Sequence, residues 1–183
     1  NFTLVADLNS STPGYDSVAS ATANGGVGFA PIGNSTTKFT GTFDGYGHTI
    51  ANLTIDRPGE DYVGLIGIAN VDSVVTNVTL EDVDVTGSSI VGGLVGETYG
   101  TVNVSSVSGA IEGDSWVGGI VGDNYGTVRE SFAIGTVNGS SDVGGIAGWT
   151  EGTVADSYSN STVTSSDDET GGLIGENAGT VTA

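Results

Sequence analysis

The chain has 183 residues, of which 22 are acidic and 3 are basic, and its formal net charge is −19. Nucleic-acid binding is excluded, because phosphate contacts need clustered Lys and Arg, whereas Lys38, Arg57 and Arg129 are scattered. The absence of Cys excludes disulfides, thiol catalysis and Cys-ligated metals. No apolar run in this chain approaches the ~20 residues that cross a bilayer as a helix.

The composition favours strands over helices. Gly occurs 32 times, Val, Thr and Ser are abundant, and Met is absent. β-Branched residues favour strands, and Gly destabilises a helix interior by ~1 kcal/mol relative to Ala. Apolar residues make up 37% of the chain, which is enough for a folded core, so the acidity does not indicate disorder.

Residues 1–60 contain all three prolines and lack the repetition that follows. Strand-like segments are predicted over 2–8, 38–43 and 49–55. The string Asp44-Gly-Tyr-Gly-His48 contains the only histidine and could bring Asp44 near His48 across a turn. We interpret it as a coil corner or hairpin with His48 exposed or bonded to the backbone, and we predict no catalytic residue.

From residue 61 onwards the sequence repeats itself. An aliphatic string bounded by glycines ends at Gly67, Gly96, Gly122, Gly148 and Gly175, at spacings of 29, 26, 26 and 27 residues, and Gly-Thr-Val follows each of the last four. Such a unit cannot bury its own apolar face and must stack on its neighbours. We therefore predict an all-β parallel β-helix (β-solenoid) of four to six coils with about 26 residues per coil. The propeller alternative is disfavoured, because its blades need ~40 residues.

Residues one repeat apart should then form columns, with neighbouring strands ~4.8 Å apart. The columns are Leu94, Ile120, Ile146 and Leu173; Val102, Val128, Val154 and Val181; and Ser106, Phe132 and Tyr158. A corner that needs a positive φ or a close approach of coils is expected at the second glycine of each string. These structural glycines are Gly93, Gly119, Gly145 and Gly172.

We assign residues 1–60 to an irregular N-terminal cap with imperfect coils and 61–183 to the repeats, in one continuous domain. A cap is expected because the open end of a solenoid presents unpaired N–H and C=O groups. The last repeat stops after its second apolar piece. Either the natural chain continues, or another molecule covers this edge, and end-to-end self-association would then build a filament.

The strings Gly64-Leu-Ile-Gly67, Gly93-Leu-Val-Gly96 and Gly172-Leu-Ile-Gly175 resemble the GLUG-motif repeat family, named for Gly-Leu-aliphatic-Gly. Two coils have Ile in place of Leu. Residues 39–50 are similar to the segment that often precedes such repeats, so the resemblance covers residues 28–183. It implies a module of a large secreted or surface-attached protein, often adhesin-like and sometimes beside an extracellular peptidase, and it implies no catalytic residues.

N-glycosylation sequons are frequent. They include eight of the twelve asparagines, more than the Ser and Thr content alone explains. We favour N-linked glycans on a secreted surface, although Asn, Ser and Thr are also common in turns. The acceptors are Asn1, Asn9, Asn34, Asn52, Asn77, Asn103, Asn138 and Asn160.

The acidity has three explanations. The runs Asp167-Asp168-Glu169 and Glu81-Asp82-x-Asp84 could bind Ca²⁺, although short acidic runs are usually solvated faces. The third explanation is adaptation to brine. Like charges repel in dilute buffer, whereas in molar salt the screening length falls to ~3 Å and the repulsion is weakened. We favour a halophilic source, an archaeon, and predict no cofactor and no metal site, with Ca²⁺ the one alternative.

Tyr99 and Tyr125 recur 26 residues apart in Tyr-Gly-Thr-Val, and Trp116 and Trp149 lie beside Gly-Gly turns. The tyrosines could form a ladder for a glycan or a partner, or they could pack on each other over the coil interior. We expect a non-enzymatic, extracellular structural or adhesive module at a cell surface or in a filament. The alternative is a non-catalytic repeat or carbohydrate-binding region of a larger secreted hydrolase.

Overall fold

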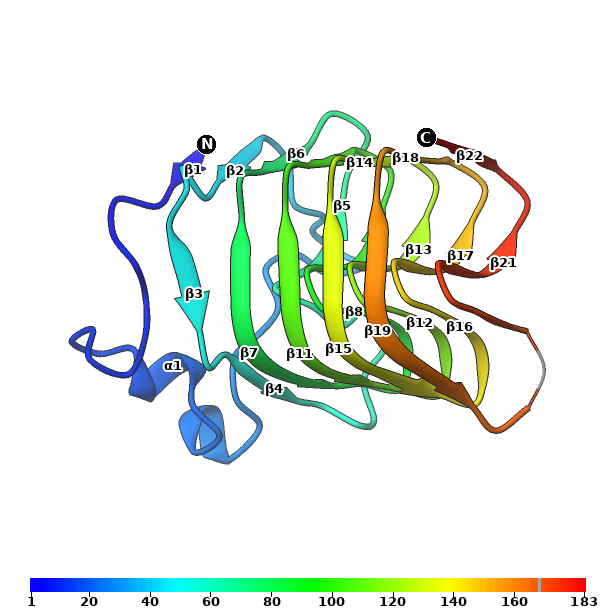
Figure 1. Cartoon of the computed structure of the whole chain (residues 1–183). Coiled ribbons are helices and arrows are strands. Elements are labelled where there is room, and N and C mark those ends of the chain that lie inside the picture. The colour runs from blue at the N-terminus through cyan, green and yellow to red at the C-terminus, as the bar shows by residue number, and fades with distance from the viewer. Residues whose placement is uncertain (168) are drawn as a thin grey trace.

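The computed structural model describes residues 1–167 and 169–183, which form a stack of parallel coils with the two chain ends at opposite ends of the stack (Figure 1). The strands belong to four parallel sheets, which we call A, B, C and D. From β6 onwards, the chain passes through sheets A, B, D and C in that order and then begins the next coil. In sheet A, Val102 pairs with Val128 and Val128 with Val154, each 26 residues further along the chain. The predicted β-solenoid with one coil per repeat is therefore confirmed.

The four sheets are built from parallel strands of successive coils. Sheet A contains β1 (Phe2–Thr3), β2 (Thr42–Asp44), β6 (Val74–Thr76), β10 (Thr101–Asn103), β14 (Thr127–Arg129), β18 (Thr153–Ala155) and β22 (Thr180–Thr182). Sheet B contains β3 (Thr49–Ala51), β4 (Thr54–Asp56), β7 (Thr79–Thr86), β11 (Ser106–Glu112), β15 (Phe132–Gly139) and β19 (Tyr158–Ser165). Sheet D contains β8 (Ser89–Gly92), β12 (Ser115–Gly118), β16 (Ser141–Gly144) and β20 (Thr170–Gly171). Sheet C contains β5 (Ile66–Ala69), β9 (Val95–Thr98), β13 (Val121–Asn124), β17 (Ala147–Thr150) and β21 (Ile174–Asn177).

The core is a set of columns of like aliphatic side chains inside the coil. Leu94, Ile120 and Ile146 expose none of their surface, and neither do Val102 and Val128. Burying one such side chain contributes about 1.5–3 kcal/mol. Because each coil repeats the same positions, these contacts add along the stack and fix the register.

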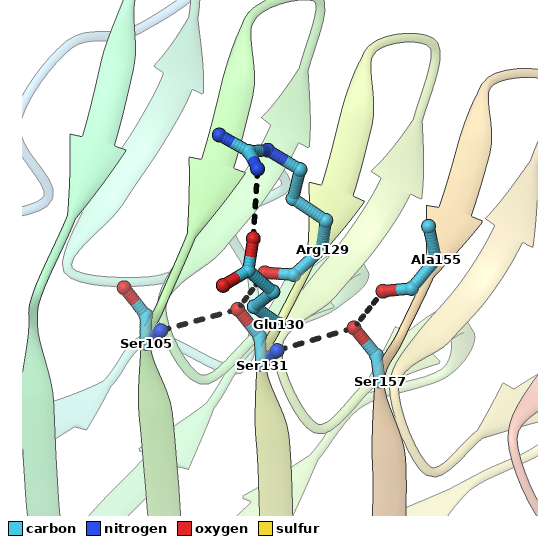
Figure 2. Close-up of polar contacts among 6 residues, drawn as sticks. All are labelled: Ser105, Arg129, Glu130, Ser131, Ala155 and Ser157. Atoms are coloured by element: carbon cyan, nitrogen blue, oxygen red, sulfur yellow. Dashed lines mark hydrogen bonds and ion pairs between the residues drawn. The ribbon is translucent and has the colours of Figure 1, made fainter. Parts of the chain in front are cut away.

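A ladder of serines holds the corner between sheets A and B (Figure 2). The N–H of Ser105 donates to Oγ of Ser131 at 3.2 Å, and the N–H of Ser131 donates to Oγ of Ser157 at the same distance. Each of these two hydroxyls also donates to a backbone carbonyl of its own coil, that of Arg129 for Ser131 and that of Ala155 for Ser157. The ladder satisfies buried polar groups at a turn where the sheet bonds are interrupted.

The second glycines of the repeated strings lie between sheets D and C. A Cβ at Gly93, Gly119 or Gly145 would lie 2.6, 2.3 or 2.4 Å from the carbonyl oxygen of the equivalent glycine on the next coil. None of the four, Gly172 included, has a positive φ. At Gly172 a Cβ would meet nothing within 4 Å. The close approach of coils, and not the backbone conformation, therefore demands glycine at the first three positions.

The N-terminal segment forms short elements over the first coil. It includes the helix α1 (Asp16–Ala19) and the 3-10 turn η1 (Ala23–Gly25), which lie at the N-terminal end of the stack (Figure 1). The expected strand over 2–8 is only the two-residue β1 followed by an isolated bridge at Leu8, and the one over 38–43 is displaced to β2. The strand over 49–55 is interrupted, as β3 and β4. An apolar cavity of about 210 Å³ remains beneath this segment.

In the turn that contains the only histidine, the residue that contacts His48 is not Asp44, which the sequence had suggested. Nδ1 of His48 lies 3.1 Å from Oδ1 of Asp7, whereas Asp44 accepts hydrogen bonds from the N–H of Tyr46 and the side-chain amide of Asn77. Asp44 therefore ends β2 and caps the turn rather than orienting the imidazole. The hydrogen bonds from Thr49 and His48 lower the pKa of Asp7. Among the described residues, no helix has both the length and the apolarity to span a membrane.

Candidate functional site

The two recurring tyrosines lie face to face at the edge of sheet C. Tyr99 follows β9 and Tyr125 follows β13, so the stacking of coils places one ring over the other. Their centroids are 4.9 Å apart and their planes differ by 5°. Tyr125 is 38% exposed. The pair forms a small ladder that is partly accessible to solvent at Tyr125.

The two tryptophans extend this ladder. Trp149 on β17 meets Tyr125 edge-on at 5.4 Å, and Trp116 on β12 stacks on Trp149 at 6.1 Å. Because Trp116 comes from sheet D and Trp149 from sheet C, the cluster bridges two sheets. Such ring arrangements each contribute about 0.5–1.5 kcal/mol beyond area burial.

Two carboxylates lie beneath the tyrosines. Glu97 on β9 and Asp123 on β13 are direct partners in sheet C, and they are only 8% and 1% exposed. The hydroxyl of Tyr99 donates to Oε1 of Glu97 at 2.9 Å. Oδ1 of Asp123 is buried and has no hydrogen-bond partner among the described residues. We call these two acids with Tyr99, Tyr125, Trp116 and Trp149 the aromatic–acidic face.

Burial perturbs the titration of this face. Desolvation, and then the charges of Glu97 and Glu151, raise the pKa of Asp123 to about 7, while a hydrogen bond from Tyr125 opposes the shift. Desolvation and the neighbouring carboxylates also raise the pKa of both tyrosines. Burial beside other carboxylates therefore favours the protonated form of Asp123 more than in a solvated aspartate.

A cation of the protein itself already contacts the face. Nζ of Lys38, from the N-terminal segment, lies 4.0 Å from the centroid of the Tyr99 ring. An ammonium over an aromatic ring is attracted by the ring quadrupole. The arrangement of flat rings with carboxylates suits a sugar ring or a cationic group.

The predicted acidic runs separate in space. Glu81, Asp82 and Asp84 lie on β7 with exposed side chains. Of the run 167–169, Asp168 lies outside the described residues. The other column expected from the sequence is present on sheet B, where Phe132 and Tyr158 stack at 5.1 Å.

The eight sequon asparagines are distributed over the surface, and none is fully buried. Asn1, Asn34, Asn52 and Asn160 are exposed, and the others are half-buried. The amide of Asn77 donates to Asp44, and Asn138 accepts from Thr164, so these two side chains are already engaged. Asn52 and Asn160 are the most accessible acceptors within the coils.

Sequence reasoning missed the buried acids and Lys38. The signal for the acids was present, because Glu97-Thr-Tyr99 and Asp123-Asn-Tyr125 place an acid two residues before each recurring tyrosine. Lys38 had no such signal, because it lies outside the repeat and reaches Tyr99 only through the path of the N-terminal segment.

Comparison with known proteins finds two similar proteins and identifies no family. No protein-family model and no solved structure matches the chain. The chain is 40% identical over 111 residues to Halomucin of Haloquadratum walsbyi, which covers 60% of this chain and 1% of that protein. It is 35% identical over 86 residues to a putative Gly-rich membrane protein of Evansella cellulosilytica, which covers 45% of this chain and 10% of that protein. The chain thus spans a small part of each relative, and the resemblance to GLUG-motif repeats rests on its motifs alone.

Proposed function

We propose that the chain is a non-catalytic structural module of a larger extracellular protein at the surface of a halophile. The observation that carries this is the unbroken parallel stacking of like residues through all four sheets. A stack of this kind is a stiff spacer whose exposed positions can vary while the core repeats. The likeness to Halomucin and the charge of −19 support a saline habitat.

Removing one coil tests the spacer role. Deletion of residues 115–140 joins Asp114 to Ser141, which is the partner of Ser115 on the next coil. The shortened chain should fold cooperatively in molar salt, and small-angle scattering should show a particle shorter by about 4.8 Å. Deletion of residues 115–127 breaks the phase and should prevent folding. If both deletions behaved alike, the modular account would be wrong.

Surface exposure and glycosylation need native material. Antibodies against the chain should label intact cells of the source organism, and labelling only after lysis would contradict a surface location.

Peptide mass spectrometry should find glycans at the exposed Asn52 and Asn160, and none at Asn177, which is exposed but lies outside a sequon. Unmodified Asn52 and Asn160 would remove the glycan proposal.

Carbohydrate binding at the aromatic–acidic face is the second candidate function, supported by the parallel rings of Tyr99 and Tyr125. Oligosaccharides should quench the fluorescence of the neighbouring tryptophans with a saturable dependence. Tyr125→Ala should abolish this, and Tyr46→Ala, which removes an exposed tyrosine elsewhere, should not. Quenching that is unchanged in Tyr125→Ala would exclude this face as the binding site.

End-to-end association through coil edges and membership of the GLUG-motif repeats stay predictions. The parallel strands of every coil could pair with those of a second copy in the same way as they pair within the chain, which supports the first. Sedimentation at increasing concentration in molar salt tests it, and a monomer at all concentrations would contradict it.

A further inference from the structure

A separate group of carboxylates lies where the last coil meets the one before it. It consists of Asp142 on β16, Glu169 just before β20 and Glu176 on β21. One carboxylate oxygen of each lies within 4.8 Å of the other two. Asp142 is buried, and the two glutamates are exposed, so the group is open to solvent on one side.

The Asp142 carboxylate is not satisfied by the protein. The residue is 7% exposed, and its Oδ1 is buried without a hydrogen-bond partner in residues 1–167 and 169–183. A buried carboxylate oxygen without a partner is costly, because it loses its water and gains nothing in return. A buried carboxylate with an unpartnered oxygen, beside two further carboxylates, points to a missing positive ligand.

The basic side chains of the chain are engaged away from Asp142 and Glu176. Arg57 pairs with Glu60, Arg129 pairs with Glu130, and Lys38 lies over the Tyr99 ring. These are all the Lys and Arg residues of the chain. Within the part of the chain that the structure describes, none of them forms an ion pair with Asp142 or Glu176.

In the columns of Asp142 and Glu176, the residue one coil earlier is a tryptophan. Trp116 occupies the position of Asp142 one coil earlier, and Trp149 is the direct partner of Glu176 in sheet C. The two tryptophans stack on each other. One coil further along each column, Asp142 follows Trp116 and Glu176 follows Trp149, so the same backbone geometry brings like charges together. A bound cation would convert this repulsion into a stabilising contact.

We propose that Asp142, Glu169 and Glu176 bind one Ca²⁺ ion. Ca²⁺ takes 6–8 oxygen ligands at 2.3–2.6 Å, so oxygens on opposite sides of the ion lie about 4.6–5.2 Å apart. Carboxylate oxygens within 4.8 Å of one another can therefore share one ion. Mg²⁺ fits less well, because it demands near-ideal octahedral geometry and dehydrates reluctantly. The ion would join two coils, since Asp142 belongs to one coil and the glutamates to the next.

Terbium luminescence tests the site, because Tb³⁺ replaces Ca²⁺ and Trp149, the partner of Glu176 in sheet C, can sensitise it. The titration is done in about 1 M KCl, where diffuse attraction of cations to the acidic surface is screened. Wild type should show one saturable site that Ca²⁺ displaces and that Mg²⁺ displaces much less. The double variant Asp142→Asn/Glu176→Gln should bind at least about tenfold more weakly, because affinity follows the number of charged ligands.

The matched control is Glu81→Gln/Asp84→Asn, which removes the same charge from the exposed acidic run on β7. It should bind like wild type. Saturating Ca²⁺ should also raise the melting temperature of wild type and of the control, but not of the Asp142→Asn/Glu176→Gln variant. If that variant fails to fold by circular dichroism, the exposed single substitution Glu176→Gln replaces it. No saturable binding in wild type, or equal binding in the site variant and the control, would overturn the proposal.

Discussion

An interior coil and the last coil carry the same motif in different surroundings. Val128 exposes none of its surface, whereas Val181, in the same column, is 44% exposed. A Cβ at Gly119 would lie 2.3 Å from a carbonyl oxygen, whereas one at Gly172 would meet nothing within 4 Å. Identical residues thus contribute unequally, because a coil gains much of its burial from the neighbour that stacks on it.

The largest expected difference between these coils is at the glycines. Gly119→Val should unfold the chain or lower its free energy of unfolding by more than about 4 kcal/mol, because the new side chain collides with backbone of the next coil. Gly172→Val should change it by less than about 1 kcal/mol. Urea denaturation in molar salt measures both, and equal losses would refute the role assigned to close coil approach.

A smaller difference is expected at the valines. Val128→Ala leaves a cavity in the column and should cost about 2 kcal/mol, whereas Val181→Ala should cost less than about 0.5 kcal/mol. The same denaturation experiment compares them. A comparable cost at both positions would mean that burial of Val128 by adjacent coils is not what stabilises it.

The smallest effect concerns the acids of one column on sheet C, Asp123 inside and Glu176 on the last coil. Because the folded-state pKa of Asp123 is raised to about 7 from 3.8, the folded state binds the proton more tightly, and this residue lowers stability as pH rises through that range. Asp123→Asn should therefore be more stable than wild type by about 1–2 kcal/mol at pH 8, after allowance for solvent screening, and by little at pH 4. A constant difference between Asp123→Asn and wild type at all pH values would contradict the assignment.

The sequence determined the coil and its columns because the repetition itself specifies which residues stack. The spacing of Val102, Val128 and Val154 predicts their pairing directly. Contacts that leave the repeat were not predictable, such as Lys38 on Tyr99 and Asp7 on His48, because they depend on the path of non-repeating segments.

The group of Asp142, Glu169 and Glu176 was predictable from the sequence only in part. The period places Glu169 in the column of Asp142, but Glu176 joins them from another sheet, and that contact depends on how the chain turns between sheets D and C. A period alone orders residues along the stack and says little about which columns are neighbours around the coil.

The register itself can be measured by disulfide formation, since the chain has no Cys. Ala110 pairs with Thr136, and Thr136 pairs with Thr162, on the exposed face of sheet B. The variant Ala110→Cys/Thr136→Cys should form an intramolecular disulfide on mild oxidation, because neighbouring strands place such Cα atoms within the usual range of about 4.4–6.8 Å. The variant Ala110→Cys/Thr162→Cys, two coils apart, should not. Failure of the first pair to cross-link in folded protein, or equal cross-linking of the second, would contradict the stacking of residues one repeat apart.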